Sequence, residues 1–243
     1  MGSGYLTYHG VKKDYSVFKA RVDGSLTEVT AEMLDGATKI YNSAFNDCDS
    51  LTSVTIPSSV TSIGNNAFSN CDGLTSISIP NSVTSIGEST FSNCSALTSI
   101  DISSSVTEIR YGVFSRCKAL TSITIPSSVT SIDGYVFSWC TALTSVTIPN
   151  SVTSIGSSAF NGCNALTSID IPSSVTSIGM DLVRGCTLLT SIIVEATTPP
   201  TLGYAALDGT HANLVIYVPS ESVNAYKTAT NWSKYASKIQ AIP

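Results

Sequence analysis

Serine and threonine hydroxyls are abundant in this sequence, but a hydroxyl becomes a nucleophile only beside a base. The two histidines are His9 and His211, near opposite ends of the chain. Neither has an acidic residue and a serine in an obvious catalytic arrangement. In the stacked array deduced below they would lie roughly 30–40 Å apart, at about 4.8 Å per coil. We therefore expect no hydrolase chemistry through a serine nucleophile.

Other catalytic and metal-binding patterns are also missing from the sequence. There is no glycine-rich phosphate loop, and Asp47-Cys48-Asp49 lacks the rest of a calcium loop. Asp101 and Asp170 hold equivalent repeat positions, but three repeats separate them by roughly 14 Å, too far for the usual glycosidase pair. No CxxC motif or nearby histidine offers a metal site. We expect a protein that is not an enzyme and has neither metal nor cofactor.

The cysteines mark a repeat. They recur every 23 residues, at Cys48, Cys71, Cys94, Cys117, Cys140, Cys163 and Cys186. Phenylalanines keep the same step three residues earlier, at Phe45, Phe68, Phe91, Phe114, Phe137 and Phe160, with Val183 in the seventh place. A fixed period in the twenties is the signature of a solenoid.

This even spacing also argues against disulfides. One cysteine per coil forms a column with steps of about 4.8 Å, in which the side chains point the same way. Such parallel side chains have poor disulfide geometry. We expect a buried column of free cysteines that act as small hydrophobic residues.

The repeat is clearest in residues 51–73, LTSVTIPSSVTSIGNNAFSNCDG. Val54 and Ile56 flank Thr55 in an in–out–in pattern that predicts a short strand, and Pro57 ends it because proline has no N–H for a ladder. Burying about seven large apolar side chains supplies roughly 10–20 kcal/mol. Ordering one unit costs more, roughly 23–46 kcal/mol, so the units must stack.

The second half of the unit returns the chain to the next coil. Val60 and Ile63 predict a second short extended segment. Gly64 fits a turn with positive φ or a close approach between coils. Residues 67–71 fit one turn of α or 3₁₀ helix. The sequence thus predicts a β-rich repeat solenoid with short parallel strands and one-turn helical segments.

Three regions follow from the extent of the repeat. Residues 1–25 lack it and predict an N-terminal cap, because a terminal coil has one face in water. Residues 26–194 contain the 23-residue repeats, the first of them degenerate. Residues 195–243 break the period at Pro199-Pro200 and predict a C-terminal cap of strand and helix.

Within the C-terminal region, residues 214–218 predict a last strand. Ser220 fits the N-cap of a following helix, with Glu221 near its positive end. Apolar residues are spaced to cover the open end of the core: Val223, Tyr226, Trp232, Tyr235 and Ile239. We interpret Trp232 as a plug of that end.

The recurring pattern LxxIxIPxxVxxIGxxAFxxCxxL resembles the BspA-like leucine-rich repeats, a class of bacterial and protist surface proteins. The resemblance covers about 150 residues, 51–194. Ser103 replaces the proline of the pattern, Arg110 and Asp133 replace its glycine, and residues 181–183 do not match the last AF turn. The ending TTPPTLG…IYVPSESVNAYKTA…YASKIQAI is similar to the C-terminal cap of such proteins from Bacteroidetes.

This resemblance implies a right-handed leucine-rich-repeat solenoid and, commonly, a role in adhesion or host interaction at the cell surface. It carries no catalytic motif. It implies an extracellular or cell-surface location, although Met1-Gly2-Ser3-Gly4 lacks the layout of a signal peptide. We therefore expect a signal peptide to have been removed or omitted.

The composition argues against two classes of partner, nucleic acid and membranes. Lys and Arg number 12 against 17 Asp and Glu, the net charge is −5, and no basic run occurs. These features argue against nucleic acid and anionic membranes. No apolar stretch approaches the roughly 18 residues of a membrane-spanning helix, so we expect no membrane insertion.

One surface candidate is a hydroxyl ladder on the outward face of the main strands. Its two columns are Ser53, Ser76, Ser99, Ser122, Ser145 and Ser168, and Thr55, Ser78, Asp101, Thr124, Thr147 and Asp170. This face could bind protein or glycan, or consist of soluble, β-compatible residues in a duplicated array. Ice binding is disfavoured because Asp101 and Asp170 interrupt the ladder.

The sharper candidate for a binding site is a set of bulky residues where other units carry small or polar ones. These are Arg110, Tyr111, Arg116, Tyr135 and Trp139. Exposed Trp, Tyr and Arg are the composition of an interaction hot spot. The alternative is local pairing, with Arg116 over Trp139 as a cation–π contact and Arg110 beside Asp133 as an ion pair.

We expect a non-enzymatic, monomeric interaction module of the adhesin type that binds a host or neighbouring-cell protein or glycan. Repeat arrays offer extended surfaces that their side chains specialise. The alternative is a structural spacer that displays another part of a protein and has no ligand of its own.

Overall fold

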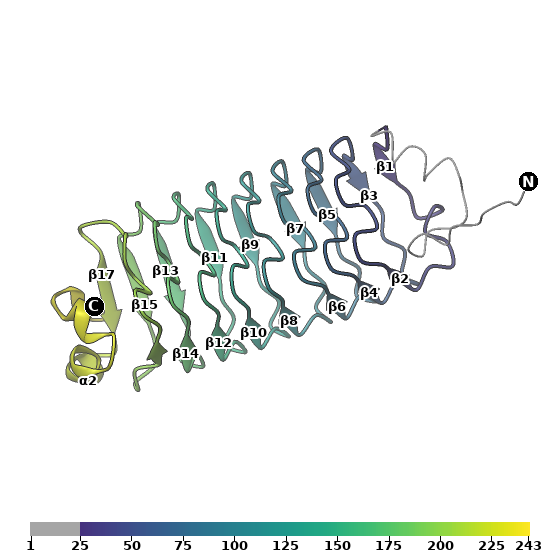
Figure 1. The fold of residues 1–243 in the computed structure, drawn as a ribbon. Helices are drawn as coiled ribbons and strands as arrows, with labels where there is room; N and C mark the ends of the chain where they lie inside the picture. Colours follow the sequence, from purple (N-terminus) through teal and green to yellow (C-terminus); the bar gives the residue numbers. More distant parts are fainter. Residues whose placement is uncertain (1–24) are drawn as a thin grey trace, which may run out of the picture.

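The structure, a computed structural model, describes residues 25–243 as a solenoid of about nine turns built from short parallel strands (Figure 1). This confirms the predicted fold class. The predicted N-terminal cap falls outside the described residues, apart from Ser25. Two lines of strands run along the solenoid, and each coil up to residue 202 contributes one strand to each line.

The first line contains the outward-facing hydroxyl positions. Its strands are β1 (Glu28–Val29), β3 (Ser53–Val54), β5 (Ser76–Ser78), β7 (Ser99–Asp101), β9 (Ser122–Thr124), β11 (Ser145–Thr147), β13 (Ser168–Ile171), β15 (Ser191–Val194), β17 (Val215–Val218) and β18 (Ile239–Ala241). The predicted alternation is confirmed, since Val54 is half-buried, Thr55 exposed and Ile56 buried. β13, β15, β17 and β18 form its longest sheet.

The second line follows the predicted extended segment. Its strands are β2 (Lys39–Ile40), β4 (Ser62–Ile63), β6 (Ser85–Ile86), β8 (Glu108–Ile109), β10 (Ser131–Ile132), β12 (Ser154–Ile155), β14 (Ser177–Ile178) and β16 (Thr201–Leu202). They form two sheets, β2–β4–β6 and β8–β10–β12–β14–β16. The ladder is therefore interrupted once, between β6 and β8.

The segment that returns the chain forms consecutive turns and no helix. In the second coil, Ala67 N–H donates to the Gly64 carbonyl (3.3 Å), the three-residue spacing of a 3₁₀ turn. Asn66 and Asn70, however, have φ of +55° and +60°, which a right-handed helix does not allow. Phe68 N–H instead donates across to Thr90 of the next coil (2.9 Å). The predicted helical turn is thus replaced by turns whose amides bond between coils.

Gly64 permits a close approach between coils. A Cβ built on it would lie 2.5 Å from the backbone nitrogen of Asn42 in the preceding coil. Its φ is not positive, so of the two expected reasons for glycine here, the close approach applies.

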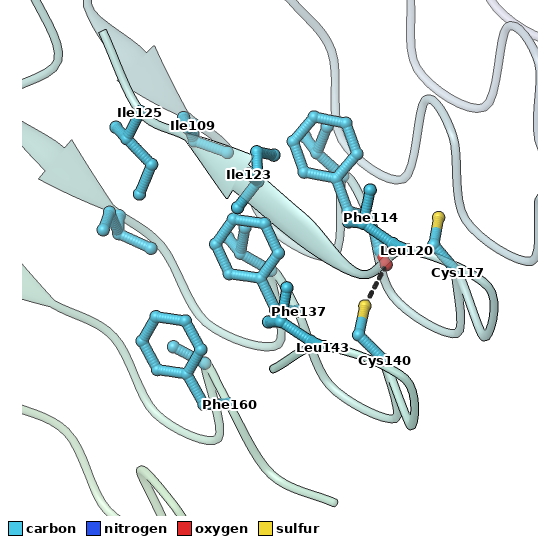
Figure 2. Packing of buried hydrophobic residues seen from close by; sticks show 14 of the residues in the cluster. Ile109, Phe114, Cys117, Leu120, Ile123, Ile125, Phe137, Cys140, Leu143 and Phe160 are labelled. Atoms are coloured by element: carbon cyan, nitrogen blue, oxygen red, sulfur yellow. Dashed lines mark hydrogen bonds between the residues drawn. The ribbon is translucent and has the colours of Figure 1, made fainter. Parts of the chain in front are cut away.

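The phenylalanine column forms the centre of the core. From Phe45 to Phe160, successive rings stack with centroids 5.3–5.9 Å apart and planes within 12° of parallel. All six rings are fully buried. Figure 2 shows the rings of Phe114, Phe137 and Phe160 lying one behind another, beside the leucine and isoleucine columns.

The cysteines are free and buried, as predicted. Each thiol from Cys71 onward also donates a hydrogen bond to the phenylalanine carbonyl of the preceding coil. One example is Cys140 Sγ to the Phe114 carbonyl oxygen at 3.1 Å (Figure 2). Burial is the main cause that raises the pKa of Cys94 and Cys140 to about 12.

The sheets continue past residue 194. β16 pairs with β14, and β17 pairs with β15, so residues 195–217 add a further coil. The chain then forms a 3₁₀ turn (Ser220–Ser222), helix α2 (Val223–Thr228) and a second 3₁₀ segment (Ser233–Lys238), shown in yellow at the C-terminal end in Figure 1. Strand β18 pairs with β17 and extends the first line.

Trp232 closes the end of the core, as predicted. It is 1% exposed, its ring packs edge-on against Tyr226, and its Nε1–H donates to the Pro200 carbonyl (2.8 Å). The predicted N-cap at Ser220 is wrong, because Ser220 is the first residue of the 3₁₀ turn and Pro219 is its N-cap. The Ser220 hydroxyl donates to the Glu221 carboxylate instead (3.2 Å).

The thiol column predicts a simple titration result. Ellman reagent should find few reactive thiols in the native protein at pH 8, because the thiols are buried, and all seven in denaturant without reductant. Fewer than about three thiols after denaturation would mean disulfides and would contradict the free column.

Candidate functional site

The predicted site lies in the turn segments of two neighbouring coils. Arg110, Tyr111 and Arg116 follow β8, whereas Tyr135 and Trp139 follow β10. All five residues are exposed. The structure therefore places the candidate residues together, side by side along one edge of the solenoid.

Two positions of the turn segment are left-handed in each of the eight described coils that contain this segment. The first column contains Ser43, Asn66, Ser89, Gly112, Tyr135, Ser158, Asp181 and Ala205, and the second contains Asp47, Asn70, Asn93, Arg116, Trp139, Gly162, Gly185 and Gly209. Asn, Asp and Gly tolerate this backbone best. Arg116, Tyr135 and Trp139 do not, and each such residue costs roughly 1–2 kcal/mol.

A ladder of asparagine side chains precedes the cluster in one column. Asn42 Oδ1 accepts from Asn65 N–H, and Asn65 Oδ1 accepts from Glu88 N–H, both at 2.9 Å. In the next coil this position is Tyr111. A column in which each asparagine side chain accepts from a backbone N–H of the next coil therefore ends at Glu88, one coil before Tyr111.

A second ladder ends in the same coil. Asn70 Nδ2 donates to Asp47 Oδ1 (2.7 Å), and Asn93 Nδ2 donates to Asn70 Oδ1 (2.8 Å). The next residue in this column is Arg116, followed by Trp139. Both ladders thus give way to bulky side chains at the same coil.

The Tyr111 and Trp139 rings lie against glycines of the following coil. A Cβ on Gly162 would lie 3.0 Å from two indole atoms of Trp139, and one on Gly134 would lie 3.6 Å from the Tyr111 ring. The Tyr111 and Tyr135 rings are tilted against each other, with centroids 5.2 Å apart. Even so, Tyr111, Tyr135 and Trp139 remain 48%, 42% and 50% exposed.

The expected cation–π contact between Arg116 and Trp139 is not formed. Among the described residues, the cation–π contacts are those of Lys234 with Tyr204 and Tyr235. Arg116 and Trp139 share the same backbone conformation, and the indole lies over Gly162 of the following coil, on the side away from Arg116.

The expected ion pair between Arg110 and Asp133 is also absent. Arg110 Nε lies 3.5 Å from Glu108 Oε2, two residues earlier in the same coil. Desolvation and the Glu108 charge raise the pKa of Asp133, and the charge of Arg110 opposes them. Arg110 is therefore partly neutralised by Glu108.

The rest of the surface offers fewer features for chemistry. The hydroxyl columns of the first strand line are exposed along their whole length, and their role stays a prediction. In the part of the chain that the structure describes, no three His, Cys, Asp or Glu side chains are grouped as metal ligands, and no helix is long and apolar enough to cross a membrane. His211 Nδ1 accepts from Asn213 N–H (3.1 Å).

Sequence reasoning missed the backbone conformation beneath the cluster and the glycines that support its rings. Both could have been read from the columns. Positions 47, 70 and 93 hold Asp or Asn, and positions 162, 185 and 209 hold Gly, the residue types that favour a left-handed backbone.

The left-handed position of Arg116 predicts the effect of a substitution. Arg116→Asn should raise the free energy of unfolding by about 1 kcal/mol, because asparagine tolerates this backbone and its amide can extend the ladder from Asn93. Urea unfolding measures the change. Lys118→Asn, at an exposed residue with ordinary φ, serves as the control and should change stability by less than about 0.5 kcal/mol. Equal stabilities for the two variants would contradict the strain at Arg116.

Solved structures of bacterial proteins resemble this chain. A leucine-rich repeat protein from Bacteroides ovatus is 27% identical with a TM-score of 0.63, over 80% of this chain and 55% of that one. This chain thus spans about half the length of the Bacteroides protein. The T. pallidum leucine-rich repeat protein is 29% identical with a TM-score of 0.60, over 77% and 81% of the two chains. A leucine-rich cell surface protein from Faecalibacterium prausnitzii is 28% identical with a TM-score of 0.54, over 92% and 66%.

No curated protein matches the chain. The model of one family does, in six copies of its repeat that extend over residues 18–143 and 107–231. These ranges include nearly all of the solenoid and part of the C-terminal region. The chain belongs to the BspA-type leucine-rich repeat family.

Proposed function

We propose that this protein is a binding module of the cell surface or extracellular space, and that it engages a protein or glycan of a host or neighbouring cell through Arg110, Tyr111, Arg116, Tyr135 and Trp139. It acts by binding and not by catalysis, as a monomer and as an adhesin-type module. Its family consists typically of interaction scaffolds, and a similar solved structure is named a cell surface protein.

One observation carries the proposal: bulky residues replace Asn or Gly at left-handed positions in two adjacent coils. Arg116 and Trp139 have a left-handed backbone. The same position in six other coils is Asn, Asp or Gly, residue types that adopt this conformation at lower cost. Their side chains fill no core, since both are exposed. Local strain without a packing benefit is typical of functional positions.

The chemistry of the cluster suits a partner with both apolar and polar groups. The three aromatic rings present rigid, half-exposed area at little cost in side-chain entropy. Arginine adds donors that can bond carboxylate and carbonyl oxygens. The glycines below Tyr111 and Trp139 keep these rings close to the solenoid, which leaves their outer faces for a partner.

The test is an array of glycans and extracellular-matrix proteins. A variant carrying Tyr111→Ser, Tyr135→Ser and Trp139→Ser should lose at least about ten-fold in affinity for any partner of the wild type, because hot-spot truncations cost about 2 kcal/mol or more. A matched control carries Ser53→Ala, Ser76→Ala and Ser99→Ala on the hydroxyl face. Circular dichroism verifies that both variants fold.

The outcomes separate the candidate surfaces. Loss of the partner in the aromatic variant alone supports the cluster. Loss in the serine variant alone would move the site to the hydroxyl face and contradict the cluster. No partner for the wild type would favour a structural spacer, which should respond only to deletion of whole coils.

A further inference from the structure

A shallow cavity of about 230 Å³ lies along the second line of strands. Tyr41, Gly64, Gly87 and Arg110 occupy the same position in four successive coils, and all four line it. The glycines form a floor that cannot carry side chains, since a Cβ on Gly87 would lie 2.4 Å from a backbone nitrogen of the preceding coil. Tyr41 and Arg110 stand at the two ends, three coils or roughly 14 Å apart.

The cavity coincides with the interruption in the ladder between β6 and β8. Gly64 N–H donates to the Ile40 carbonyl and Gly87 N–H to the Ile63 carbonyl, both at 2.8 Å. Within residues 25–243 the equivalent bond from Arg110 N–H to the Ile86 carbonyl is missing. The Arg110 N–H and the Ile86 carbonyl, both from residues that line the cavity, therefore do not bond to each other.

The charge of the cavity is opposite to that of the chain. The protein carries a net charge of −5, yet Lys39 and Arg110 line the cavity and no Asp or Glu does. The carboxylate of Glu108 contacts Arg110 only at Nε (3.5 Å). Among the described residues, Lys39 has no ion pair.

Side-chain amides add fixed donors. Asn42 and Asn65, which also line the cavity, use their Oδ1 atoms in the ladder that holds them in place. Their Nδ2 groups have no hydrogen-bond partner in the part of the chain that the structure describes. The cavity therefore combines two cations and two oriented amide donors above an uncharged floor.

We propose that this cavity binds a short acidic oligosaccharide, a segment of a glycan whose sugars carry carboxylates, as in hexuronic acids. Carboxylates suit Lys39 and Arg110 at the two ends. Sugar hydroxyls both donate and accept, as the Arg110 N–H and the Ile86 carbonyl require. The length of about 14 Å accommodates two or three sugar units. The site shares Arg110 with the aromatic cluster but does not depend on binding there.

The experiment titrates the full chain with trigalacturonate in a calorimeter and compares it with the fully methyl-esterified trisaccharide, which has the same shape without charge. Trigalacturonate should bind at least about ten-fold more tightly, the usual effect of charge-assisted hydrogen bonds. Acetate and monomeric galacturonate are titrated as well. Amide shifts in NMR spectra should concentrate at Gly64, Asn65 and Gly87.

Variants locate the site. Lys39→Gln should weaken trigalacturonate about ten-fold. Lys118→Gln, an exposed lysine outside the cavity, should leave its affinity unchanged. Both substitutions are at exposed positions, so the variants should fold.

Several outcomes would overturn the inference: equal affinity for the esterified trisaccharide, equal affinity for acetate, equal losses in both variants, or shifts confined to other coils. The proposed function is tested separately. If trigalacturonate does not bind while the aromatic cluster still captures its partner, the acidic-glycan site alone is refuted.

Discussion

Each coil of this solenoid is held to its neighbours by backbone hydrogen bonds, and most paired strands keep a register of 23 residues. Thr84 N–H donates back to Thr61, and Phe68 N–H donates forward to Thr90. This register places every residue between two residues of the same repeat position. A side chain that stacks on its own kind, such as phenylalanine or asparagine, is therefore favoured again in the next coil, and the columns of the sequence follow.

The same register explains why variation is concentrated at a few positions. Inside, a change of residue breaks a column on both sides, so phenylalanine and cysteine persist. At the turn positions the side chains face water and can differ. Arg110 and Asp133 both occupy a glycine position; the break between β6 and β8 coincides with Arg110, whereas Asp133 N–H still donates to the Ile109 carbonyl. The aromatic residues of the candidate site begin beside that break.

The repeat made most of the fold predictable. The strand before Pro57, the extended segment at Ile63 and the buried cysteines all follow from alternation and period. The turn at residues 65–70 did not, because apolar spacing alone cannot distinguish a helical turn from turns with left-handed residues. The members of the candidate site were visible as departures from their columns. Their contacts were not, since the backbone conformation sends Trp139 over Gly162 and local spacing pairs Arg110 with Glu108.

The near-identity of the coils also has a consequence for folding. Two coils that are both regular can pair with each other almost as well as each pairs with its true neighbour, so a growing stack could close with one coil looped out. Such an error leaves the core columns intact and is penalised only where coils differ. The plug at Trp232 and the irregular coils that contain Arg110 and Trp139 are such places. These irregular places favour the correct number and order of coils in an otherwise periodic molecule.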